Sequence, residues 1–151
     1  VYALDKNEQV YVKQILPGQK GGYIERPDNL SHLDNAWPDE GACVIGNSLL
    51  YGDAWLGPGA VMEDNAQVCG SAKVKNSRIK GHAYVHGHSR ITHRSDVGGD
   101  LIIKDHSVIR TSTITSEDDC YIYGDAVIDH YHGVIKEHVR DERFYRQHYS
   151  G

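Results

Sequence analysis

Histidines are the residues of this sequence best suited to chemistry, and several of them lie in one segment. The chain has ten histidines in 151 residues, and four of them lie in GHAYVHGHSRITHR at positions 81–94. An imidazole can ligate a metal ion, and it can accept a proton from a reacting group near neutral pH. Either role requires structural elements that bring His86, His88 or another imidazole together with further polar groups.

A six-residue repeat defines those elements. In GDAWLGPGAVMEDNAQVCGSAKV (52–74), alanines recur six residues apart, and an aliphatic residue follows each of them two positions later. A period of six is a multiple of the two-residue period of a strand and does not match the 3.6-residue period of a helix. The pattern therefore predicts short strands separated by tight turns, with both members of each pair facing inward.

This pairing of a small residue with an aliphatic residue continues for fifteen repeats, from Ala42/Val44 to Ala126/Ile128. Gly with Asp or Asn stands between many of the pairs, and these residues tolerate the unusual backbone angles of tight turns. A chain that turns after each short strand closes after three repeats. It would form a triangular solenoid whose parallel strands stack about 4.8 Å apart.

Val68-Cys-Gly-Ser-Ala72 and Val85-His-Gly-His-Ser89 resemble the hexapeptide repeat of the left-handed β-helix proteins, an aliphatic residue with a small residue four positions later. The resemblance covers residues 36–129, roughly five coils. It implies an all-β fold, a single-stranded left-handed parallel β-helix. GGYIE and NLS, followed by DNAW (34–37), also resemble the N-terminal cap of a YdcK-like group found in enterobacteria and in phage and prophage genomes, whose members are often labelled acyltransferases.

Both ends of such a solenoid need covering, because they expose unpaired strand edges. We expect an N-terminal cap at 1–33 with a strand at 10–15, the β-helix at 34–130, and a C-terminal helix at 131–151. The helix is predicted from one stripe of side chains, formed by Ile135, Val139, Glu142, Tyr145 and Tyr149. It would cover the last coil or dock onto a neighbouring subunit, and the N-terminal strand could cover Trp37 and Trp55.

In the coil model His88 and His106 occupy the same turn of successive coils, and His86 lies on the strand just before that turn. The three imidazoles could therefore converge. As metal ligands they are weak candidates: His88 and His93 have a spacing that resembles two ligands of the gamma-class carbonic anhydrases, but the third expected histidine is absent. In the acyltransferases of this fold a histidine acts as general base beside an acyl-CoA in a groove between subunits, which makes His88 or His86 the catalytic candidate. The third interpretation is a solvated polar ladder at the turns.

One face of the predicted prism is more apolar and aromatic than the other two. Its outward residues include Leu49, Tyr51, Tyr84, Ile102, Tyr121 and Tyr123. A contiguous apolar surface of this kind is typical of an interface. Since proteins of the resembled family commonly form trimers, we expect this face to pack subunit against subunit in a homotrimer.

Composition excludes several function classes. The net charge is −5 and no basic block is present, which argues against a nucleic-acid partner. No apolar run is long enough for a membrane span, and the N-terminus has no signal-peptide pattern. Three separated cysteines without a C-x-x-C motif argue against a disulfide framework and fit a cytoplasmic protein.

The sequence favours a non-catalytic binding or scaffold module without a cofactor. The resemblance permits an accessory role of phage or prophage type, in which the protein binds or inhibits a host protein. The alternative is an acyl-CoA-dependent acyltransferase, with coenzyme A as cofactor and a histidine general base at the subunit groove.

Overall fold

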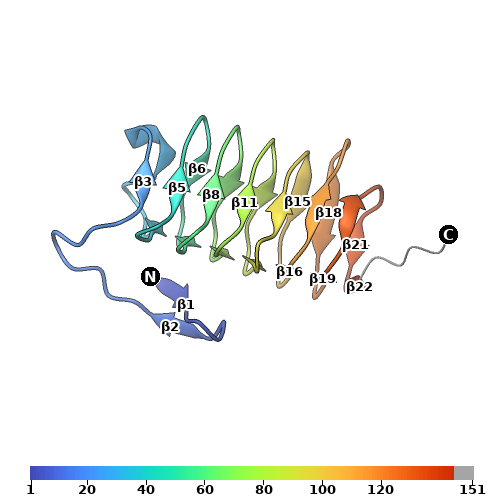
Figure 1. The fold of residues 1–151 in the computed structure, drawn as a ribbon, viewed down its shortest axis with the longest axis horizontal. Coiled ribbons are helices and arrows are strands. Elements are labelled where there is room, and N and C mark those ends of the chain that lie inside the picture. Colours follow the sequence, from blue (N-terminus) through green and yellow to red (C-terminus); the bar gives the residue numbers. More distant parts are fainter. Residues whose placement is uncertain (145–151) are drawn as a thin grey trace.

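The computed structural model describes residues 1–144, and from Tyr23 onward the chain winds through three parallel sheets to form a β-solenoid (Figure 1). The sheet that we call the hairpin face consists of β4 (Trp37–Pro38), β7 (Trp55–Leu56), β10 (Lys73–Val74), β13 (Arg90–Thr92), β16 (Val108–Arg110), β19 (Val127–Asp129) and β22 (Arg143–Phe144). The charged face consists of β3 (Tyr23–Ile24), β5 (Cys43–Val44), β8 (Val61–Met62), β11 (Arg78–Ile79), β14 (Asp96–Val97), β17 (Thr113–Thr115) and β20 (His132–Val134). The tyrosine face consists of β6 (Leu49–Leu50), β9 (Gln67–Val68), β12 (Tyr84–Val85), β15 (Leu101–Ile103), β18 (Cys120–Tyr123) and β21 (Val139–Arg140).

The core is the column of small and aliphatic pairs inside the three sheets. All fifteen pairs predicted to face inward are buried. Val85 is in register with Val68 on one side and with Ile103 on the other, so these residues lie one above another on one wall. The all-β solenoid predicted from the repeat is therefore confirmed.

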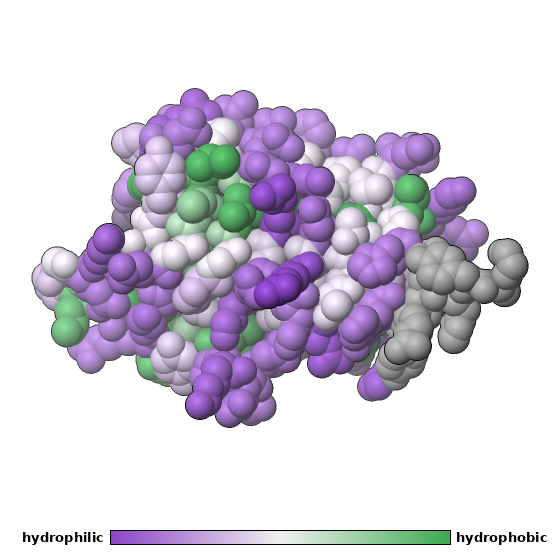
Figure 2. All heavy atoms as spheres, in the orientation of Figure 1, coloured by the Kyte–Doolittle hydropathy of each residue, from purple (hydrophilic) through white to green (hydrophobic). Residues whose placement is uncertain are grey.

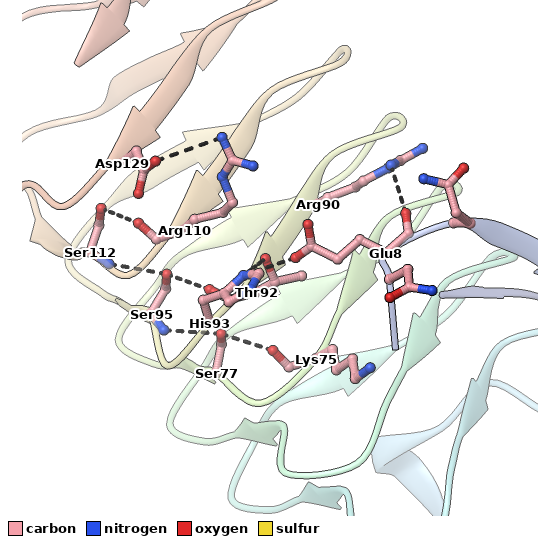
Figure 3. Close-up of polar contacts among 12 residues, drawn as sticks. Glu8, Lys75, Ser77, Arg90, Thr92, His93, Ser95, Arg110, Ser112 and Asp129 are labelled. Atoms are coloured by element: carbon pink, nitrogen blue, oxygen red, sulfur yellow. Dashed lines mark hydrogen bonds and ion pairs between the residues drawn. The ribbon is translucent and has the colours of Figure 1, made fainter. Parts of the chain in front are cut away.

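Tight corners between the sheets explain why glycine and other small residues recur at them. At Gly87 the backbone has φ of 69°, and a Cβ there would lie 2.6 Å from the backbone nitrogen of Asp105 on the next coil. At another corner the small residues are serines, which link successive coils (Figure 3): the Ser77 hydroxyl accepts from the Ser95 amide at 3.1 Å, and the Ser95 hydroxyl accepts from the Ser112 amide at 3.2 Å. Small side chains thus allow close approach and satisfy buried backbone groups.

The solenoid has about seven coils, two more than the five predicted. The extra first coil contains β3, the 3₁₀ turn η1 (Pro27–Asn29) and β4, and the extra last coil contains β20, β21 and β22. Both coils depart from the regular spacing of the central repeats, so the hexad pattern alone did not reveal them. Buried Asn29 supports the irregular first coil, because its side-chain amide donates to the carbonyl oxygens of Gly46 and Ser48.

The prediction of a C-terminal helix is wrong for the described residues of this segment. Residues 132–144 form β20, β21 and β22, which extend the three sheets by one coil. Ile135 and Val139 are buried, as the stripe required, but they point into the solenoid. A spacing of four residues fits one face of a helix and also fits two inward positions of a coil, which explains the error. Tyr145 and Tyr149 lie outside the described residues.

The N-terminal segment covers a side of the solenoid instead of its end. β1 (Tyr2–Leu4) and β2 (Val10–Val12) form an antiparallel hairpin that lies beside the coils (Figure 1). Ala3 and Leu4 of β1 bury Trp55 of the hairpin face, and Trp37 is partly covered, so the cover comes from β1 and not from the strand predicted at 10–15. The remainder of the predicted cap, from Tyr23 onward, belongs to the first coil.

Polar contacts hold the hairpin at its turn and in the segment that follows it. Arg90 Nη1 donates to the Glu8 carbonyl oxygen at 3.3 Å, and His93 Nδ1 lies 2.9 Å from Glu8 Oε1 (Figure 3). After the hairpin, Lys13 Nζ binds both carboxylate oxygens of buried Asp39, at 2.8 and 2.7 Å. The hairpin is thus attached to several coils of the same sheet.

Most of the surface in view in Figure 2 is hydrophilic, and its hydrophobic spheres form only small groups. Among residues 1–144, no helix has the length and apolar character that crossing a membrane requires.

Candidate functional site

The tyrosine face carries three aromatic side chains on its strands that are at least partly exposed, Tyr84, Tyr121 and Tyr123. Five of the six predicted contact residues lie on strands of this sheet, and Tyr51 directly follows β6. Tyr84, Ile102 and Tyr121 are in register on β12, β15 and β18 and so form one row along the solenoid. Each of the six is at least partly exposed, and Tyr121 reaches 36% exposure. The sequence therefore placed these residues together correctly, while their use as a contact surface stays a prediction.

Hydroxyl groups meet at the first rungs of this face. Tyr51 Oη donates to Gln67 Oε1 at 3.1 Å and lies 3.5 Å from Tyr84 Oη. The Cys69 thiol lies 3.5 Å from the same Tyr84 oxygen. Burial, with the neighbouring Cys69 and Tyr84, raises the pKa of Tyr51 well above its usual range. The pKa of Tyr84 is also raised, so the hydroxyls of Tyr51 and Tyr84 stay protonated near neutral pH and act as hydrogen-bonding groups, not as anions.

Cations lie over the aromatic rings at the later rungs. Lys104 Nζ lies 5.1 Å from the centre of the Tyr121 ring and 5.6 Å from that of Tyr123. Arg140 lies 5.9 Å from the centre of the Tyr123 ring, and His138 packs edge-on against Tyr121. Cation–π contacts of this kind hold long side chains against the sheet and leave an ordered surface of mixed apolar and positive character.

The histidines form two separate stacks. His88 and His106 occupy the same corner of successive coils, as predicted, and their rings are nearly parallel with centres 5.1 Å apart. His86 instead stacks on Tyr84, with centres 4.5 Å apart. The three imidazoles are thus neighbours along one edge of the tyrosine face, but they do not converge on one point.

The surroundings of these rings limit their chemistry. Burial lowers the pKa of His86 and the charge of Lys104 lowers it further, which outweighs the opposite effect of Asp105, so this imidazole is mostly neutral at pH 7. Within residues 1–144, no carboxylate lies at ion-pair distance from His86, His88 or His106, and no three His, Cys, Asp or Glu side chains group closely enough to hold a metal ion. A catalytic histidine is usually oriented by such a carboxylate partner.

The corner beside the tyrosine face carries a polar ladder. Asn35 Nδ2 donates to Asp53 Oδ1 at 3.2 Å, and the carboxylate of Asp105 accepts from the Gly124 amide at 2.9 Å. One coil further, Asp141 accepts from the amide of Asp125 at 2.8 Å. The solvated ladder considered from the sequence is therefore present on both sides of the His88 and His106 stack.

Gln67, Lys104 and Arg140 belong to the tyrosine face, and sequence reasoning missed them. Each is in register with an aromatic residue on a neighbouring strand or lies against one, and their positions follow from the spacing of 17 to 19 residues between coils. Sorting polar as well as apolar residues by that spacing would have found them.

Comparison of the chain with known protein families and with curated proteins gives no match.

Proposed function

We propose that this protein is a non-catalytic binding module, and that copies of the chain assemble into a homotrimer through the tyrosine face. The supporting observation is that the three faces differ in how far their outward side chains are covered or paired within the chain. The hairpin face is covered by the chain's own N-terminus over Trp55. The charged face carries ion pairs between its rows, such as Arg78 with Glu63 at 3.7 Å and Lys80 with Asp96 at 3.4 Å. The tyrosine face has no such cover in the described part of the chain.

Charge complementarity supports a second copy of the chain as the occupant. A closed ring uses two different patches of each subunit, so the tyrosine face of one copy would meet a neighbouring corner of the next. The face carries Lys104 and Arg140, and the adjoining corner carries exposed Asp53, Asp105 and Asp125. Opposite charges at the edge of an aromatic contact orient the partners and suppress other arrangements.

The trimer would be a rigid prism that offers its hairpin and charged faces to other proteins. The accessory role of phage type, binding or inhibiting a host protein, is part of this proposal and rests on the resemblance alone. Cys43, Cys69 and Cys120 are free thiols, which fits the reducing environment of a cytoplasmic protein.

The mass of the protein in solution tests the assembly. We expect sedimentation velocity at micromolar concentration to give three times the chain mass of 16.9 kDa. Ile102→Glu places a carboxylate at the centre of the face and should produce a monomer, because removing that charge from water in the interface costs several kcal/mol. Thr113→Glu, an exposed position on the charged face, is the matched control and should remain trimeric. A wild-type monomer, or a trimer of the Ile102→Glu variant, would show that this face does not form the interface.

An acyl-CoA-dependent acyltransferase is the second candidate, and the neutral His86 favours it because a general base must be unprotonated. Titration with coenzyme A and acetyl-CoA separates the two functions. Saturable binding that is lost in His86→Ala or His88→Ala would support the enzyme, and absence of binding at about millimolar concentration would support the binding module.

A further inference from the structure

A groove lies between the N-terminal hairpin and the hairpin face, next to the stacked histidines. It has a volume of about 410 Å³. Tyr2 and Val10 of the hairpin form its apolar wall, and Lys73 and Arg90 lie on the sheet side. His88 and His106 line its end at the corner. Val108 of β16 adds an apolar side chain on the sheet side, so the groove combines apolar walls with the nitrogen donors of Lys73, Arg90 and the two imidazoles.

The two basic residues of this groove, Lys73 and Arg90, occupy neighbouring positions on adjacent strands. Lys73 and Arg90 are in register on β10 and β13, adjacent strands of a parallel sheet that are about 4.8 Å apart. Within the described residues, neither has a carboxylate at ion-pair distance. Lys73 Nζ donates to the Ser71 carbonyl oxygen at 2.9 Å, and Arg90 donates to the Glu8 carbonyl oxygen.

This arrangement is electrostatically unfavourable in the free protein. Like charges opposite each other on neighbouring strands repel, and Lys73 is only 7% exposed, so water screens it poorly. Burial lowers the pKa of Lys73, and the charge of Arg90 lowers it further. An anion placed between the two groups would remove the repulsion and satisfy their remaining donors.

We propose that this groove binds the phosphate group of a small phosphorylated molecule, with Lys73 and Arg90 as the anion-binding residues. A phosphate monoester carries a charge of about −1.5 to −2 at pH 7, which matches two cations, whereas a carboxylate compensates only one. The guanidinium of Arg90 offers a planar fork of N–H donors, and Lys73 adds a point charge. The rest of the ligand lies against Tyr2, Val10 and the imidazole stack. This inference does not depend on the trimer.

Isothermal titration calorimetry with inorganic phosphate and phenyl phosphate tests the site, with benzoate at equal ionic strength as the non-phosphate ligand. We expect saturable binding of both phosphates, and phenyl phosphate should bind several-fold more tightly because its ring contacts the apolar wall. Benzoate should bind at least tenfold more weakly than phenyl phosphate. No saturable binding of either phosphate up to about 10 mM, or equal binding of benzoate, would overturn the proposal.

Variants assign the binding to this groove. Lys73→Met keeps the aliphatic stem, removes the charge and should weaken phenyl phosphate binding at least tenfold. Arg90→Gln should do the same, and it provides a second test if the first variant does not fold. Lys80→Met on the charged face is the matched control and should bind like the wild type. Unchanged binding in a folded Lys73→Met or Arg90→Gln variant would refute the assignment.

Discussion

Asp39 connects the N-terminal segment to the solenoid at the scale of a single residue. Its carboxylate accepts hydrogen bonds from Lys13 and, at 3.0 Å, from the indole of Trp55. Burial alone would raise the pKa of Asp39, but the hydrogen bonds from Lys13 and Trp55 and the charge of Lys13 hold it below its ordinary value of 3.8. The folded protein therefore stabilises the ionised form of Asp39 more than the unfolded chain does.

The first prediction is a pH-dependent stability contribution from this residue. Because the folded-state pKa is depressed, the contribution is fully present above the unfolded-state pKa near 4 and is lost as the pH falls through the lower folded-state value. Asp39→Asn should reduce the free energy of unfolding by about 1–3 kcal/mol at pH 7. Urea denaturation should show this difference shrinking toward zero in acid.

Asp28→Asn is the control for this experiment, because Asp28 is an exposed carboxylate in η1. It should have the stability and the pH profile of the wild type. A difference between wild type and Asp39→Asn that stays constant as the pH falls below about 4 would contradict the linkage.

At the scale of elements, the hairpin and the coils are positioned by different kinds of interaction. The coils follow from a local repeat, and each inward pair is buried by the same kind of contact with its neighbouring coils. The hairpin has no such repeat, and its position depends on the contact of Leu4 with Trp55 on a distant coil. The same distinction explains the C-terminal error, since the local spacing of Ile135 and Val139 fitted both a helix and a coil.

Leu4→Asp should detach the hairpin without unfolding the solenoid. Leu4 is buried against Trp55, and placing a charge there costs more than the about 1.5–3 kcal/mol that burying the leucine contributes. We expect the tryptophan emission to shift to longer wavelength and acrylamide quenching to increase, while the β-type circular dichroism spectrum is retained.

Val12→Asp on β2 is the matched control, since Val12 is already 69% exposed, and it should leave the emission unchanged. An unshifted spectrum in a folded Leu4→Asp protein would mean that the hairpin does not cover Trp55 in solution.

The whole molecule is a stack in which each coil contacts mainly its neighbours. Strands in the middle of each sheet have strand partners on both sides, whereas β3 and β4 at one end and β20, β21 and β22 at the other have one. β6 pairs with β9, and its other side is joined by an isolated bridge from Leu30 to Leu50. Unpaired edges also leave part of the backbone open to water. Stability should therefore increase from both ends toward the centre.

Hydrogen exchange measures this gradient directly. Amides of β12 and β14 should exchange most slowly, and those of β3, β20 and β21 should exchange fastest under native conditions. Uniform protection along the solenoid would indicate that the ends are covered in solution. Comparison with the Ile102→Glu variant, which we expect to be monomeric, would show how far assembly contributes.

The sequence by itself determined the solenoid, its inward pairs and the grouping of aromatic residues such as Tyr84 and Tyr121 on one face. It could do so because every coil packs the same kinds of side chains in the same way. Residues close together in the sequence therefore determine which side chains face inward. Only the tertiary structure decided which side chains touch: the pairing of His86 with Tyr84, the adjacency of Lys73 and Arg90, and the place of the hairpin. Such contacts join residues on different coils or on no coil at all, and they depend on register and ring orientation, which a repeat of six residues does not encode.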